Sequence, residues 1–131
     1  MSYLVIAMVM TFPLVTQMGS VFAGFPYGDA YENARHVWWF GHALRTGEPL
    51  FYQTLLAYPG GVEGVTLQSN LLQYFPAWLF ALVLPLTVAN NLHVLLTLAL
   101  NGWAMYALAR HLTGRPSAAW GAGVVFMAFP T

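Results

Sequence analysis

Apolar stretches along this chain are interrupted by a single long polar interval. Residues 3–22 are apolar and uncharged, and about 20 such residues suffice for a helix to cross the hydrocarbon core of a bilayer. The pattern predicts a transmembrane helix over residues 3–22, in which Pro13 is a kink that neighbouring helices tolerate. A cleaved signal peptide is the alternative, but no Lys or Arg precedes the apolar run.

The polar interval covers residues 28–61 and opens with a sequence typical of a surface helix. Asp29 suits the N-cap position, and Gly47 suits the first position past the helix end, so we expect a helix over residues 30–46. Its apolar residues recur at spacings of three and four; they are Ala34, Val37, Trp38, Gly41 and Leu44. The aromatic residues 38–40 suit the lipid headgroup layer, so this helix is predicted to lie along the membrane surface.

Three further apolar segments follow the polar interval. Residues 71–86 form a short run interrupted by prolines, which predicts a re-entrant or juxtamembrane helix rather than a crossing. Residues 88–112 are long enough to cross the membrane with some tilt, and residues 117–131 are interpreted as the start of a third membrane helix. His93 and Asn101 would be costly facing lipid, so we expect both to face protein. An interhelical hydrogen bond is favoured over a ligand or proton-transfer role for His93.

The composition agrees with a membrane protein. Hydrophobic residues make up 59% of the 131 residues and charged residues 6%, against about a quarter charged in soluble domains, so a soluble fold could not cover its surface. The net charge is zero without any basic run, which argues against nucleic acid as a partner. The absence of cysteine excludes disulfides and thiolate metal sites. The predicted fold class is an all-α integral membrane protein, a multi-span helical bundle whose large first extracytoplasmic loop, residues 23–70, carries amphipathic juxtamembrane helices.

The charges also predict a topology. Arg110 and Arg115 flank a short loop, and short loops that carry Lys and Arg face the cytoplasm. If residues 71–86 do not cross, one span separates this loop from the polar interval, which then faces outward. A full crossing by residues 71–86 would instead place both on one side. The predicted location is the plasma membrane, crossed several times.

Candidate chemistry concentrates at the start of the predicted surface helix. One edge of that helix carries four polar residues at neighbouring positions: Asp29, Glu32, Asn33 and His36. Such a set can hold a divalent cation, Mg²⁺ or Mn²⁺, or supply a general base. In the simpler interpretation, Asp29 caps the helix while Glu32 pairs with Arg35 or His36 at the surface. Both interpretations stay open.

A second candidate lies in residues 48–61. Tyr58-Pro59-Gly60-Gly61 is typical of a tight turn. Proline fixes φ and glycine admits positive φ, so this backbone can approach a ligand closely. Tyr58 is therefore a candidate substrate contact, and a plain connecting turn is the alternative.

The order of these elements resembles a known family. An apolar helix precedes a large loop opening with Gly-Asp, an aromatic amphipathic helix, Tyr-Pro-Gly, a proline-broken apolar segment and a helix ending in residues 106–114, YALARHLTG. The order is similar to the N-terminus of GT-C class membrane glycosyltransferases, in particular poorly characterised bacterial relatives of the dolichol- and polyprenyl-phosphate-sugar transferases. The resemblance covers nearly the whole chain. It implies further transmembrane helices beyond Thr131, with the rest of the site on them, so that the fragment alone is expected to be inactive.

The resemblance also implies a function. Family members transfer a sugar from a lipid-phosphate donor to an acceptor on the outer membrane face. An acidic residue early in the first outer loop is their catalytic base or metal-site carboxylate, and Asp29 is the matching position here. Many members have a second acid beside it; this chain has Ala30 there, with Glu32 as the nearest candidate, which puts metal dependence in doubt. Arg35 or Arg45 is expected to bind the donor phosphate, with a surface salt bridge as the alternative.

The expected substrate contacts are thus Arg35, His36, Arg45 and Tyr58, and the expected partners are the lipid-linked donor and membrane lipids. Two other functions stay open. A non-catalytic membrane subunit or scaffold would use the same helices for packing alone. A transporter would need polar residues along a path across the bilayer, for which the chain offers little besides His93 and Asn101.

Overall fold

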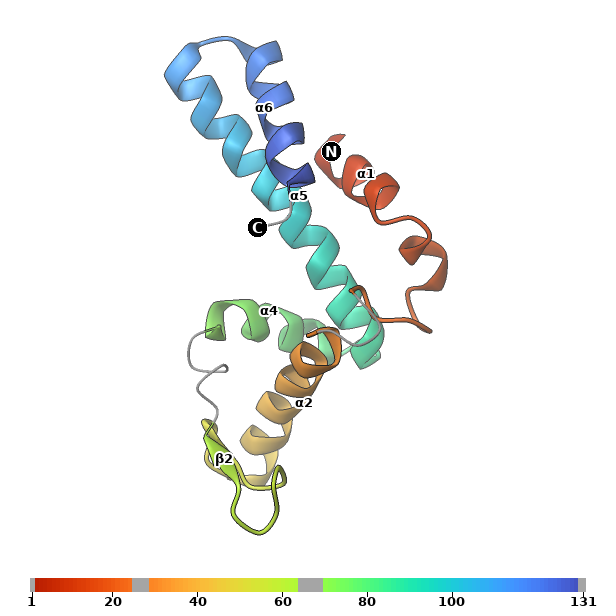
Figure 1. Ribbon diagram of the computed structural model, residues 1–131, viewed down its shortest axis with the longest axis vertical. Helices are drawn as coiled ribbons and strands as arrows, with labels where there is room; N and C mark the ends of the chain where they lie inside the picture. Colours follow the sequence, from red (N-terminus) through yellow and green to blue (C-terminus); the bar gives the residue numbers. More distant parts are fainter. Residues whose placement is uncertain (1, 25–28, 64–69, 130–131) are drawn as a thin grey trace. The chain divides into compact units, whose positions relative to one another are not determined.

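The computed structural model describes residues 2–24, 29–63 and 70–129, and these are mostly helical (Figure 1). The elements in chain order are α1 (Ser2–Met10), a 3-10 helix η1 (Leu14–Gln17), α2 (Ala30–Thr46), β1 (Tyr52–Gln53), β2 (Val62–Glu63), α4 (Leu71–Ala81), α5 (Leu86–Thr113) and α6 (Pro116–Ala128). The chain divides into two compact units. One is Gly19–Asn91, and the other combines Met1–Met18 with Leu92–Thr131.

In the unit Gly19–Asn91, α2 begins and ends where the sequence predicts. Gly47 follows it with φ 74° and donates its N–H to the carbonyl of Ala43, as expected of a glycine after a helix. Asp29 holds the N-cap position, but its side chain makes no capping hydrogen bond. The predicted carboxylate cap is therefore wrong, because the backbone of Asp29 is helical (φ −68°, ψ −5°) rather than extended as in a capping residue. Gly28, with which the polar interval begins, lies outside the described residues.

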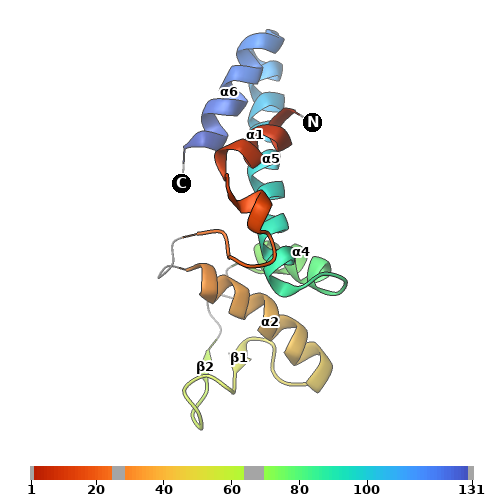
Figure 2. The same cartoon turned by 90° about the vertical axis from the view of Figure 1, so that its right-hand side faces the viewer.

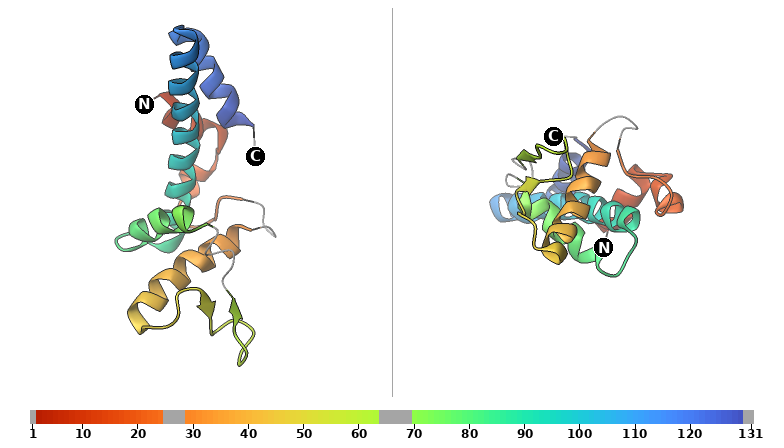
Figure 3. Two further views of the ribbon diagram at one scale, coloured as in Figure 1. Left: turned by 90° about the vertical axis from the view of Figure 1, so that its left-hand side faces the viewer. Right: turned by 90° about the horizontal axis from the view of Figure 1, so that it is seen from below.

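The buried face of α2 matches the predicted one only in part: Ala34 and Val37 are buried as expected. α2 lies against α4 (Figure 3). The core between them consists of Val37, Trp39, Phe40, Ala43, Tyr74 and Ala77. Trp38 and Leu44, both in the predicted stripe, are 43% and 54% exposed. Because Trp38 and Trp39 are adjacent, the apolar stripe of α2 can include either of them. A buried indole also needs a hydrogen-bond acceptor for its N–H. Trp39 has one, since its N–H donates to the carbonyl of Leu50 at 3.0 Å.

Residues 48–63, in which the sequence predicts only a tight turn, contain a small antiparallel ribbon (Figure 2). The register pairs Tyr52 with Glu63 and Gln53 with Val62. The Tyr58–Pro59 peptide bond is cis, and Gly61 has φ 69°, where a side chain would also overlap the ring of Tyr52. Apart from this ribbon, the described residues agree with the helical class.

The predicted helix over residues 71–86 is shorter in the structure. α4 ends at Ala81, and a turn leads to α5 at Leu86, since Pro85 has no N–H to continue a helix. The 11 residues of α4 rise only about 16 Å, roughly half of the hydrocarbon core. By its length, α4 is therefore too short to cross a bilayer.

Among the described residues, α5 is the one helix long and apolar enough to cross a membrane. It has 28 residues, and 11% of its most apolar stretch is buried. Its start is tied to the segment before α2 by Asn91, which is fully buried. The side-chain N–H of Asn91 donates to the carbonyl of Val21 at 2.6 Å, and its oxygen accepts from the N–H of Ala23 at 2.8 Å. Asn91 thus satisfies one carbonyl and one N–H of the non-helical residues 21–23.

In the other unit, α1 ends at Met10, so the prediction of one helix over residues 3–22 is wrong. Pro13 lacks an N–H, and its ring would clash with the carbonyl four residues earlier. The helix tightens before the proline, with the N–H of Phe12 donating to the carbonyl of Val9 at 3.3 Å. Only the short η1 follows.

α5 and α6 lie side by side and are joined through Gly114, whose φ is 66° (Figure 1). Gly102 and Gly123 let them approach each other and α1, because a side chain at either glycine would overlap Tyr3. α6 has 13 residues, fewer than the predicted 117–131. Asn101, which was expected to face protein, is exposed on α5, since no described neighbour covers that side.

Candidate functional site

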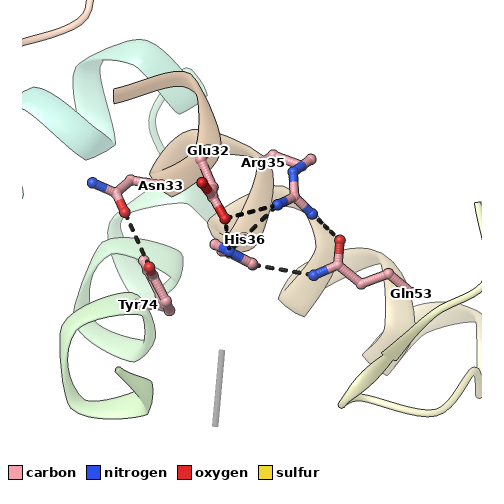
Figure 4. A network of polar contacts seen from close by, with 6 residues as sticks. All are labelled: Glu32, Asn33, Arg35, His36, Gln53 and Tyr74. Atoms are coloured by element: carbon pink, nitrogen blue, oxygen red, sulfur yellow. Dashed lines mark hydrogen bonds and ion pairs between the residues drawn. The ribbon is translucent and has the colours of Figure 1, made fainter. Parts of the chain in front are cut away.

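A cluster of polar side chains joins α2 to β1 and α4 (Figure 4). Its members are Glu32, Asn33, Arg35 and His36 from α2, Gln53 from β1 and Tyr74 from α4. Glu32 is central, because its Oε1 lies 3.3 Å from Nη2 of Arg35 and 3.3 Å from Nε2 of His36. The cluster forms because i, i+3 and i+4 positions are neighbours on a helix. The fold then adds one residue from each neighbouring element.

His36 is almost fully enclosed in the cluster, with 2% of it exposed. Nδ1 of its ring lies 3.1 Å from Nε2 of Gln53, and its ring lies over that of Tyr74 with centroids 5.0 Å apart. Burial lowers the pKa of His36, and the charge of Arg35 lowers it further, while Glu32 opposes both effects. The imidazole is therefore kept neutral, although the sequence placed it on a polar helix edge.

Arg35 is held from two sides. Besides its contact with Glu32, it donates through Nη1 to Oε1 of Gln53. Its side chain is nevertheless 31% exposed, and a guanidinium has five N–H donors. Arg35 thus keeps donors available to a ligand.

Tyr74 closes the cluster on the α4 side. It is buried, and its hydroxyl donates to Oδ1 of Asn33 at 3.0 Å. Burial raises the pKa of Tyr74, the charges of Glu32 and Asp29 raise it further, and Arg35 lowers it. Both acidic residues therefore lie within electrostatic reach of this hydroxyl.

Asp29 differs from Glu32 in its surroundings. It is exposed, and no residue of the described part of the chain forms a hydrogen bond or an ion pair with its carboxylate. The start of α2 thus carries one anchored carboxylate and one that faces solvent, a turn apart. This is a pair in which one group can hold a ligand and the other can accept a proton.

Two predicted site residues lie away from this pair. Arg45 is in the last turn of α2, about 24 Å from Asp29 along the helix axis at 1.5 Å per residue. It borders a separate apolar groove of about 330 Å³ between α2 and α4. Tyr58 is 82% exposed in the loop of the ribbon. The structure therefore unites Glu32, Arg35 and His36 close to Asp29, but it does not bring Arg45 or Tyr58 to them.

Sequence reasoning missed Gln53 and Tyr74. Gln53 is 3% exposed and lies 17 positions after His36 in the chain; a lone glutamine in a loop gives no signal of that contact. Tyr74 belongs to a segment that was interpreted by its hydropathy alone. Its single hydroxyl in an apolar run was the signal available, because buried tyrosines usually have a hydrogen-bond partner.

Within residues 2–24, 29–63 and 70–129, no three His, Asp or Glu side chains are close enough together to hold a metal ion. The two ring nitrogens of His36 already face Gln53 and Glu32. A metal at Asp29 therefore has no set of ligands among the described residues.

Comparison with protein-family models, with curated proteins and with solved structures found no match for this chain. Its function must be argued from the paired carboxylates and their surroundings.

Proposed function

We propose that this chain is the N-terminal part of a membrane transferase that moves a sugar from a lipid-phosphate donor to an acceptor at the outer membrane face. The observation that carries the proposal is the pair at the start of α2. Asp29 faces solvent, while Glu32 is held by Arg35 and His36. The order of elements, which resembles the GT-C class, supports the same function.

The outer surface of α4 suits a helix at a bilayer surface. Leu72, Phe75 and Leu79 are 91%, 42% and 44% exposed, and their spacing puts them on one side of α4. The other side carries Tyr74 and Ala77, which pack against α2. A short helix with one apolar face lies in the headgroup layer of a membrane. We propose this position for α4, which sets the carboxylates of α2 at the boundary between water and lipid.

The proposed topology places residues 29–63 outside the cell and the Arg110 to Arg115 turn in the cytoplasm. α5 is the crossing between them, in agreement with its length and hydropathy. The arginines follow the bias of short cytoplasmic loops. The site then faces the side on which lipid-linked sugars are used by envelope transferases, as the resemblance implies.

The proposed chemistry is a displacement at the anomeric carbon of the donor sugar. Asp29 accepts the proton of an acceptor hydroxyl as the oxygen attacks that carbon. The bond from the anomeric carbon to the phosphate oxygen breaks, and the lipid phosphate leaves with its electron pair. Arg35, about 9 Å along the helix from Asp29, offers its remaining donors to that phosphate. Glu32 holds the acceptor through a hydrogen bond.

The test is transfer of label from a polyprenyl-phosphate-linked ¹⁴C-hexose, presented as a panel of sugars, to endogenous acceptors. Membranes of cells with the complete protein are compared with membranes of cells without it. Label in a membrane glycan only when the protein is present supports the proposal. No protein-dependent transfer with any donor of the panel favours a scaffold, since the cluster of α2 would then only fasten β1 and α4.

A further inference from the structure

The contacts around His36 determine which of its nitrogens carries the proton. The groups that face it are Glu32 and Arg35 from α2, Gln53 from β1 and Tyr74 from α4. The side chain of Gln53 can be placed first, because a guanidinium donates hydrogen bonds and never accepts them. Its contact with Nη1 of Arg35 must use the amide oxygen of Gln53.

The amide nitrogen of Gln53 therefore points to His36. It lies 3.1 Å from Nδ1, and an amide nitrogen only donates, so Nδ1 must accept and carries no proton. A neutral imidazole then has its proton on Nε2. Nε2 lies 3.3 Å from Oε1 of Glu32, so its N–H donates to that oxygen.

The same oxygen accepts from Arg35, with Nη2 at 3.3 Å. The four side chains thus form a closed ring: Arg35 donates to Gln53 and Glu32, Gln53 donates to His36, and His36 donates to Glu32. Nη2 of Arg35 also lies 3.5 Å from Nε2 of His36, but Oε1 of Glu32 is its nearer acceptor. With Gln53 placed in this way, the Nε2–H tautomer gives each of these side chains an acceptor, whereas a proton on Nδ1 would face the N–H of Gln53.

We propose that His36 is a positioning residue, fixed by Gln53 as the neutral Nε2–H tautomer, which holds Oε1 of Glu32 so that Oε2 is presented to a ligand hydroxyl. No described residue donates to Oε2, and the side chain of Glu32 is 47% exposed. The tautomer of His36 and the ring of hydrogen bonds follow from the contacts alone and do not depend on the activity of the protein. The statement that the ligand is the acceptor sugar rests on the proposed function.

The tautomer is tested by ¹⁵N NMR of the complete protein labelled at histidine, in nanodiscs. Wild-type His36 is expected as the neutral Nε2–H form at pH 7. Gln53→Glu keeps the size of the side chain and the bond to Arg35 but places an acceptor opposite Nδ1. His36 should then take a second proton and appear as imidazolium at pH 7.

His42 on the same helix is the internal control, since it lies outside the ring and stacks on Trp38; its signals should not change in the Gln53→Glu variant. A wild-type His36 that is charged or protonated at Nδ1 would overturn the ring. An unchanged His36 in Gln53→Glu would overturn the role of Gln53.

The effect on Glu32 is tested with two variants of His36 in the transfer assay. The amide nitrogen of Gln reaches the place of Nε2, whereas that of Asn reaches only the place of Nδ1. His36→Gln should therefore keep the KM for the acceptor near the wild-type value. His36→Asn should raise it about tenfold, the loss of a hydrogen bond to a charged group, with kcat nearly unchanged.

Equal KM values for the Gln and Asn variants would overturn the positioning role. If the NMR result holds but the wild-type protein transfers no sugar, the proposed function fails and the tautomer stands. If transfer occurs but His36 has the other tautomer, the proposed function stands and the positioning role fails.

Discussion

Tyr74 offers the sharpest test of how α4 is fastened to α2. It is 2% exposed, and it contributes both a ring in the core and a hydroxyl that donates to Asn33 at 3.0 Å. Tyr74→Phe removes the hydrogen bond alone and should cost about 0.5–1.5 kcal/mol of stability. Tyr74→Ala also leaves a cavity and should cost about 3–5 kcal/mol, as aromatic truncations in cores do.

The control is Leu72→Ala on the same helix. Leu72 lies on the face of α4 proposed to contact the headgroup layer and is outside the core with α2, so its truncation leaves that packing intact and should change the stability by less than about 0.5 kcal/mol. The assay is thermal unfolding in nanodiscs, followed by tryptophan fluorescence because Trp39 is buried beside Tyr74 in the core. At about 2–8 °C per kcal/mol, Tyr74→Ala should lower the Tm by at least about 6 °C and Leu72→Ala by no more than about 4 °C. Equal shifts for the two variants would refute the packing of α4 on α2 through Tyr74.

Three further predictions concern topology, pH and helix packing. Cysteines introduced as Glu63→Cys and Gly114→Cys in this cysteine-free chain should react with an impermeant maleimide from opposite sides of the membrane; reaction of both in intact cells would contradict the proposed topology. The lowered pKa of His36 means that the folded state binds fewer protons than the unfolded chain, so stability should be constant well above pH 6.5 and fall as the pH drops below about 6.5. His36→Gln should weaken this dependence, and an unchanged pH profile of unfolding would exclude His36 as its source. Gly123→Ala should destabilise the unit of α1, α5 and α6 by about 1–3 kcal/mol through overlap with its neighbours, whereas Gly121→Ala, with open space around it, should not; equal Tm values would argue against that packing.

The sequence predicted α2 well because its boundaries are local. The glycine after the helix acts within one turn, and the helix begins and ends at the expected residues although the side chain of Asp29 makes no capping hydrogen bond. The prediction of the buried face was wrong at Trp38 and Leu44, because the adjacent Trp38 and Trp39 make two stripes equally apolar. Trp39 is the buried one because the fold brings the carbonyl of Leu50 within hydrogen-bond distance of its indole N–H.

In residues 3–22 the sequence indicated a kink but not that the helix would end there. Pro13 was recognised as a kink, but a proline within an apolar run does not say whether neighbours will repair the helix. Here the chain leaves the helix before the proline, and Asn91 satisfies the backbone of Val21 and Ala23 instead. That asparagine lies about 70 positions away in the chain, beyond any local pattern.

The sequence predicted those contacts of the candidate site that lie within α2. Glu32 was expected to pair with Arg35 or His36 in the simpler interpretation, because i, i+3 and i+4 positions are neighbours on a helix, and it contacts both. Gln53 and Tyr74 were missed since tertiary contacts bring them in. These two contacts change the expected chemistry, because they bury His36, and burial favours its neutral form.

The central claim is that Asp29 accepts a proton rather than capping a helix, and Asp29→Asn in the complete protein tests it most directly. Asn caps about as well as Asp, and the carboxylate of Asp29 makes no capping bond, so folding and insertion should be unchanged. The charge is lost, and sugar transfer should fall by about 10²–10⁴, as on removal of a general base. Glu63→Gln, which neutralises an exposed carboxylate on β2, is the matched control and should keep the wild-type rate. Transfer by Asp29→Asn at the wild-type rate would contradict the account and leave the start of α2 a structural element.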